Sequence, residues 1–89
     1  MVTADHANWV QQLRLEQQLL VKADIDIEEG WQRIRNQQDL VDWLQRTGHD
    51  TGQAERLVHL LKQTLVEWER HRSLIKQRVA YLEEQVASH

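Results

Sequence analysis

The sequence contains no proline, no cysteine and no phenylalanine, and three of its 89 residues are glycine. Without proline nothing forces a helix to end early, so Gly30, Gly48 and Gly52 are the only residues that favour a break. Without cysteine the chain forms neither a disulfide nor a thiolate metal site. No apolar run approaches the roughly 18 residues that a membrane-spanning helix needs, and residues 1–6 lack the segments of a secretion signal. We therefore expect a single soluble domain over residues 1–89, located in the cytoplasm.

The residues that are present favour long helices. Apolar residues recur at spacings of three, four and seven on both sides of one turn-forming segment, residues 47–52. This pattern predicts an all-α helical hairpin, with one helix over about residues 4–47, a turn at about 48–51 and a second helix over about 52–87. Gly48 suits the position just after the first helix, where a left-handed conformation is common.

Candidate capping residues precede both helices. Thr3 or Asp5 can accept a hydrogen bond from the first free amide groups of the first helix. Asp50 or Thr51 can do the same for the second helix. The short turn between the helices is of the length that joins antiparallel neighbours in a bundle.

Each helix carries one apolar stripe that we expect to face the other helix. In the first helix the stripe consists of Trp9, Leu13, Leu20, Ala23, Ile27, Trp31, Ile34, Val41 and Leu44. In the second helix it consists of Ala54, Val58, Leu61, Leu65, Trp68, Arg72, Ile75, Val79, Leu82 and Val86. Antiparallel closure places Trp31 opposite Trp68, both in the core. It also brings Asp24, an acidic break in the first stripe, to the level of Arg72, the basic break in the second.

A three-helix bundle is the alternative architecture. Residues 24–30 hold the weakest part of the first helix, because Asp26 and Glu29 resemble a capping box and Gly30 costs about 1 kcal/mol relative to alanine. A break here would leave a first helix of about 18 residues beside a last helix of about 36 residues, or about 54 Å. Such unequal lengths pack poorly, so a continuous first helix is favoured.

A second apolar flank runs beside both stripes. A helix that touches one neighbour needs one apolar face, so two adjoining faces indicate two neighbours. Two hairpins side by side form a four-helix bundle, and we therefore expect a homodimer. A helix from a different protein is the alternative occupant of the groove. The residues expected at the dimer or partner interface are Leu15, Leu19, Leu40, Trp43, Leu60, His71 and Leu74.

Few residues suggest a catalytic or metal-binding site. Glu67 and His71 lie four residues apart on the second helix, and Glu28 is expected opposite His71. Di-iron bundles also combine carboxylates and histidines at one level, but they use a Glu-x-x-His spacing, which this chain lacks. Glu28, Glu67 and His71 are therefore weak metal candidates, and an ion pair between His71 and a carboxylate is favoured.

Other catalytic or cofactor motifs are absent from the sequence. No histidine occupies a clean core position for binding a haem, and no glycine-rich phosphate loop is present. A thin bundle also offers no pocket of the usual ligand size. We expect no cofactor and no enzymatic activity.

Several short motifs resemble those of a group of small, functionally uncharacterised bacterial helical proteins. The motifs are Glu29-Gly30, Gly48-His49-Asp50-Thr51, Ala54-Glu55-x-Leu57-Val58 and His71-Arg72. The resemblance covers about residues 22–75. It implies a helical hairpin with a Gly-His-Asp-Thr turn and a bacterial origin, and it assigns no activity and no functional residue.

The charge of the chain bears on its partners. The net charge is −3 and no face is obviously basic, which argues against nucleic acid as a direct partner. The sequence predicts a protein–protein interaction module: a small scaffold, adaptor or regulatory subunit that acts as a homodimer. The alternatives are a metal- or haem-binding bundle and a regulator associated with nucleic-acid machinery.

Overall fold

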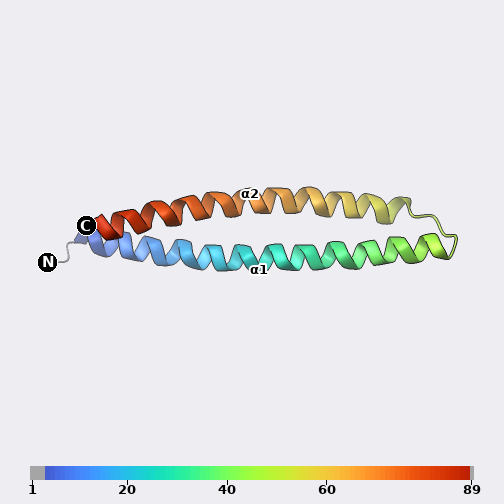
Figure 1. The fold of residues 1–89 in the computed structure, drawn as a ribbon, viewed down its shortest axis with the longest axis horizontal. Coiled ribbons are helices and arrows are strands. Elements are labelled where there is room, and N and C mark those ends of the chain that lie inside the picture. The colour runs from blue at the N-terminus through green and yellow to red at the C-terminus, as the bar shows by residue number, and fades with distance from the viewer. Residues whose placement is uncertain (1–3, 89) are drawn as a thin grey trace. The chain divides into compact units, whose positions relative to one another are not determined.

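The structure, a computed structural model, describes residues 4–88. These residues form two α-helices, α1 (Ala4–Arg46) and α2 (Gly52–Ser88), arranged as a hairpin (Figure 1). The predicted all-α hairpin is confirmed, and both helices begin and end within one residue of the expected positions. Asp5 lies in the first turn of α1, where negative charge is favourable, whereas Thr3 lies outside the described residues.

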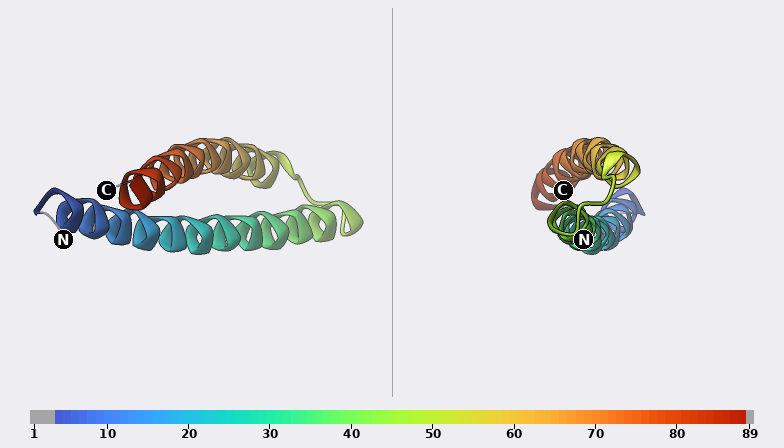
Figure 2. Two further views of the ribbon diagram at one scale, coloured as in Figure 1. Left: turned by 60° about the vertical axis from the view of Figure 1, so that its left-hand side comes forward. Right: turned by 90° about the vertical axis from the view of Figure 1, so that its right-hand side faces the viewer.

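Helix α1 runs without a break through residues 24–30 (Figure 2). The three-helix alternative is therefore wrong. Gly30 is buried in the seam between the helices, and Asp24 accepts a hydrogen bond from Arg72 Nε on α2. Gly30 and Asp24 thus both contact the second helix, and those contacts offset the cost of about 1 kcal/mol that glycine brings to a helix interior.

The end of α1 is closed by a Schellman motif. Gly48 adopts a left-handed conformation with φ 74°, as expected for the residue after a helix. The His49 amide donates a hydrogen bond to the Leu44 carbonyl (2.8 Å), and the Gly48 amide donates one to the Gln45 carbonyl (3.2 Å). These bonds give partners to carbonyl groups that the helix itself leaves unpaired.

Asp50 caps the start of α2, as predicted. The Asp50 carboxylate accepts a hydrogen bond from the Gly52 amide (3.0 Å). The Thr51 carbonyl accepts the first helical hydrogen bond, from the Glu55 amide (2.9 Å). Asp50 therefore fills the predicted capping role, and Thr51 supplies the carbonyl at which the helical hydrogen bonds begin.

Contacts divide the chain into two compact units, each built from parts of both helices. Unit 1 comprises Met1–Asp24 and Arg70–His89, and unit 2 comprises Ile25–Glu69. The single domain expected over residues 1–89 stays a prediction.

The seam between α1 and α2 follows a coiled-coil spacing of alternating three and four residues in each unit. Every predicted stripe position of α2 is buried or half-buried, Arg72 included. In α1 the seam also contains Glu16, Gly30 and Gln37.

Trp31 does not lie in the core. Its side chain is 41% exposed, because its neighbour Gly30 occupies the seam position at this level. The expected pairing of Trp31 with Trp68 is therefore wrong, since Trp68 packs against Gly30 instead. The predicted alignment of Asp24 with Arg72 in unit 1 is confirmed.

Candidate interaction faces

Exposed apolar side chains outnumber buried ones. Among residues 4–88, the buried apolar side chains are Ile34, Ala54, Leu65, Ile75, Val79 and Leu82. The large apolar side chains that stay at least 41% exposed are Leu15, Leu19, Val21, Ile25, Trp31, Leu40, Trp43, Leu57, Leu60, Val66, Leu74 and Tyr81. A two-helix seam is too narrow to cover them, so they form surfaces that a partner can contact.

In unit 1, one groove is lined by apolar side chains from both helices. The groove, of about 260 Å³, is lined by Gln12, Leu15, Glu16, Arg78, Tyr81 and Leu82. Leu19 lies four residues after Leu15 and Leu74 lies seven before Tyr81, so both continue the same helical faces. We call Leu15, Leu19, Leu74 and Tyr81 the leucine face of unit 1.

Charged groups beside this face are paired within unit 1. Glu16 occupies a seam position with its side chain 20% exposed, and its Oε2 atom lies 3.1 Å from Arg78 Nε. That oxygen accepts no aligned hydrogen bond, so the attraction of the Arg78 charge compensates the carboxylate for lost hydration. A partner that covers this face therefore leaves Glu16 and Arg78 paired with each other.

Unit 2 carries a similar face on one side of its seam. Arg33 and Thr64 line a hollow of about 80 Å³ beside Gly30, so the two residues share a side. Leu40 lies seven residues after Arg33, and Leu57 lies seven before Thr64, which places both leucines on that side. Trp43 and Leu60 follow three residues later on each helix. We call Leu40, Trp43, Leu57 and Leu60 the leucine face of unit 2.

Trp43 also makes a contact with the turn that the sequence analysis did not predict. Its ring stacks on His49, with centroids 5.7 Å apart and planes 12° apart. The Thr47 hydroxyl lies 2.7 Å from His49 Nδ1 and also donates to the Trp43 carbonyl (2.9 Å). A Schellman motif commonly brings these two positions together, so the Gly48 signal could have indicated the contact. Half of the Trp43 side chain remains exposed.

The opposite side of unit 2 holds an apolar groove. The groove, of about 410 Å³, is lined by Trp31, Ile34, Arg35, Gln38, Lys62, Leu65, Val66 and Glu69. Ile34 and Leu65 are buried at its base, whereas Trp31 and Val66 are exposed. We call this the Trp31 groove.

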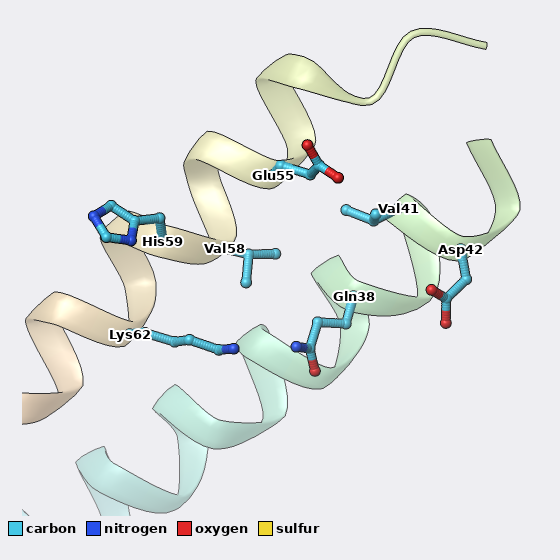
Figure 3. A pocket seen from close by; sticks show the side chains of 7 residues that line it. All are labelled: Gln38, Val41, Asp42, Glu55, Val58, His59 and Lys62. Atoms are coloured by element: carbon cyan, nitrogen blue, oxygen red, sulfur yellow. The ribbon is translucent and has the colours of Figure 1, made fainter. Parts of the chain in front are cut away.

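A second hollow on this side of unit 2, of about 530 Å³, lies nearer the turn. It is lined by Gln38, Val41, Asp42, Glu55, Val58, His59 and Lys62 (Figure 3). Val41 and Val58 point toward each other, whereas His59 and Asp42 point away from the hollow. A histidine and a carboxylate that diverge in this way do not form an acid–base pair.

The weak metal candidates do not form a ligand set. Among residues 4–88, no three or more histidine, aspartate and glutamate side chains come together as metal ligands. Glu28 is instead paired with Arg35, at 3.3 Å between Oε1 and Nη2. His71 is exposed beside the leucine face of unit 1.

Within the part of the chain that the structure describes, neither helix combines the length and apolarity needed to cross a membrane.

Comparisons with protein-family models, curated proteins and solved structures find no match to this chain. The resemblance to small bacterial hairpin proteins, and the origin it implies, therefore stay predictions.

Proposed function

We propose that this chain is a non-enzymatic protein–protein interaction module that acts as a homodimer, with two hairpins packed through their leucine faces. The area of exposed surface carries the proposal. A compact monomer of 10.6 kDa would expose roughly 5,500 Å², whereas this chain exposes 6713 Å². The excess of about 1,200 Å² is larger than the roughly 800 Å² that each partner buries in a standard interface.

The chemistry of the leucine faces supports the same proposal. Leu15 and Leu60 are 54% and 57% exposed, although leucine is among the residues most often buried. Covering the exposed half of such a side chain stabilises a complex by roughly 1 kcal/mol, about half of the gain from burying a fully exposed leucine. Repeated over both faces, this gain is enough to offset the entropy that two chains lose on association.

Solution mass across a dilution series tests the proposal. Light scattering after size exclusion is expected to give twice the chain mass at micromolar concentration and to approach the monomer mass on dilution. A monomer throughout the series would contradict the proposed homodimer.

A matched pair of variants tests whether the leucine face forms the contact. Leu19 and Val21 are both exposed on α1, at 46% and 60%, but they lie on different faces. Leu19→Lys is expected to weaken the dimer at least tenfold, which corresponds to about 1.4 kcal/mol. Val21→Lys is expected to leave the dissociation constant within threefold of the wild-type value. Equal effects of the two variants would contradict the assignment of the interface.

The Trp31 groove favours a second candidate function, the docking of a helix from another protein. Its exposed indole, apolar base and charged rim are the features of a groove that accepts an amphipathic helix. Because the groove lies across the unit 2 seam from the leucine face, a scaffold could use both surfaces at once. A photo-crosslinking residue at position 66 is expected to capture a partner, whereas one at Gln63 is not. The same products from both positions would contradict specific docking.

The metal- or haem-binding alternative and the alternative of a nucleic-acid-associated regulator have no supporting observation among the described residues.

A further inference from the structure

The outer face of α1 has a pattern that is nearly symmetric about Glu29. At alternating spacings of three and four, this face carries Leu15, Leu19, Lys22, Asp26, Glu29, Arg33, Asn36, Leu40 and Trp43. Two large apolar side chains stand at each end of the pattern, and polar or charged side chains stand between them. The helix is continuous through all of these positions, so they share one helical face.

We infer that two copies of the chain pack with their α1 helices antiparallel, related by a two-fold axis at Glu29. This inference rests on the proposed homodimer and specifies its geometry. Leu15 then lies against Trp43 of the second copy, and Leu19 lies against Leu40 of the second copy. A two-fold interface repeats each contact, so the apolar side chains at both ends of the pattern are covered by the second copy.

Charge decides between the antiparallel and the parallel arrangement. Parallel α1 helices would place each charged residue beside its own copy, so Asp26 would meet Asp26 and Arg33 would meet Arg33. The antiparallel arrangement instead places Asp26 beside Arg33 of the second copy, and it does so twice. On α1, Glu29 alone meets its own copy, with Arg33 four residues away on the same helix as a counter-charge. On α2, the same axis places Glu67 beside its own copy. Like charges across an interface disfavour the wrong pairing, so the antiparallel dimer is preferred.

Helix α2 gives an independent indication of the same axis. Leu60 and Leu74 lie seven residues before and after Glu67, on one face of α2. Within unit 2, Glu67 lies at the level of Glu29, because Gly30 packs against Trp68. An axis at this level therefore also brings Leu60 against Leu74 of the second copy. One symmetry operation thus pairs exposed leucines on both helices, Leu19 with Leu40 and Leu60 with Leu74 of the second copy.

Single-cysteine cross-linking tests this geometry, because the natural chain contains no cysteine. Glu29→Cys is expected to form a covalent dimer under mild oxidation, since the axis brings the two copies of this residue together and a disulfide needs Cα atoms within about 7 Å. Lys22→Cys alone is expected not to cross-link, because its two copies lie about 21 Å apart along the helices. Asn36→Cys alone is likewise expected not to cross-link. An equal mixture of Lys22→Cys and Asn36→Cys is expected to form the mixed disulfide.

The outcomes separate the geometry from the proposed function. A dimeric mass without the Glu29→Cys cross-link would overturn the geometry and indicate that α1 packs against α2 of the second copy. A Lys22→Cys cross-link to itself would also overturn it and indicate a parallel dimer. In both cases the homodimer would stand, whereas a monomeric mass would overturn both proposals.

Charge reversal provides a second test that requires no oxidation. Arg33→Glu is expected to weaken the dimer at least tenfold. The new carboxylate would face two acidic side chains of the second copy, in place of the arginine that compensates them. The double variant Asp26→Arg/Arg33→Glu is expected to bring the dissociation constant back to within threefold of the wild-type value. Circular dichroism at high protein concentration checks that each variant remains helical. A double variant as weak as Arg33→Glu would overturn the pairing of Asp26 with Arg33.

Discussion

The backbone of Gly30 packs directly against the indole ring of Trp68. A Cβ atom at residue 30 would lie 3.6 Å from Trp68 Cζ3 and 3.1 Å from Leu65 Cδ1, the second distance being tighter than ordinary van der Waals contact. Leu65 is only 4% exposed, so its side chain has little room to move. The missing side chain at Gly30 therefore leaves Leu65 and Trp68 room to pack together in the seam of unit 2.

Gly30→Leu is expected to lower the free energy of unfolding by about 1–3 kcal/mol, because the added side chain overpacks the seam. Gly30→Ala is expected to change it by less than about 1 kcal/mol, since better helix propensity offsets the crowding of Leu65. Urea denaturation followed by circular dichroism measures both. In a Trp68→Ala background, which opens the space, Gly30→Leu is expected to cost less. The same cost in both backgrounds would contradict this account of Gly30.

The two helices differ in how far their seams could be predicted from the sequence. Each seam position of α2 except Arg72 carries an apolar side chain, so periodicity alone identifies the stripe. In α1 the same reasoning selected Trp31, the larger apolar residue, over Gly30. Periodicity is read from the apolar side chains that are present on one helix. Whether a position without a side chain belongs in the seam depends on the residue that packs against it from the other helix. The position on α1 against which Trp68 packs depends on how the two helices are aligned, so it could not be predicted from the sequence of α1 alone.

The candidate interaction faces could likewise be predicted only in part from the sequence. Leu15 and Leu74 were predicted to lie outside the seam, because helical spacing alone decides which flank a residue occupies. The stacking of Trp43 on His49 was not predicted, since it requires the closed geometry of the turn at Gly48. The groove beside Trp31 was also missed, because the residue had been placed in the core.

The left-handed conformation of Gly48 gives a prediction with an internal control. Gly48→Ala is expected to lower the free energy of unfolding by about 1–2 kcal/mol, because a Cβ atom is unfavourable at positive φ. Gly52 lies in the first turn of α2, where an added Cβ would make ordinary contact with Asp50 at 3.4 Å. Gly52→Ala is therefore expected to be neutral or stabilising by up to about 1 kcal/mol. Chemical denaturation of the two variants side by side tests the difference, and equal losses would contradict the role of Gly48.

Arg72 is the one charged residue in the stripe of α2. Its pair with Asp24 is partly exposed, with the two side chains 38% and 50% accessible, so the pair contributes only about 0–1 kcal/mol. Arg72→Leu is expected to raise the free energy of unfolding by about 1 kcal/mol, because it adds apolar contact in the seam. Arg72→Ala is expected to lower it, since both the pair and the aliphatic stem are lost. Thermal and urea unfolding measure both variants, and a less stable Arg72→Leu protein would show that the ion pair outweighs apolar packing at this position.

Glu16 and Arg78 offer the clearest test of coupling within unit 1, because the carboxylate is more buried than its partner. The two side chains are 20% and 47% exposed. Arg78→Ala leaves the Glu16 carboxylate in the seam without this counter-charge, and it is expected to lower the free energy of unfolding by about 1 kcal/mol after screening by solvent is allowed for. Glu16→Leu is expected to raise it, because a seam position then carries an apolar side chain. In the Glu16→Leu background, Arg78→Ala is expected to cost much less, which gives a coupling energy of roughly 1 kcal/mol in a double-mutant cycle. Strictly additive effects would mean that Arg78 contributes through its aliphatic contacts and not by compensating the Glu16 charge.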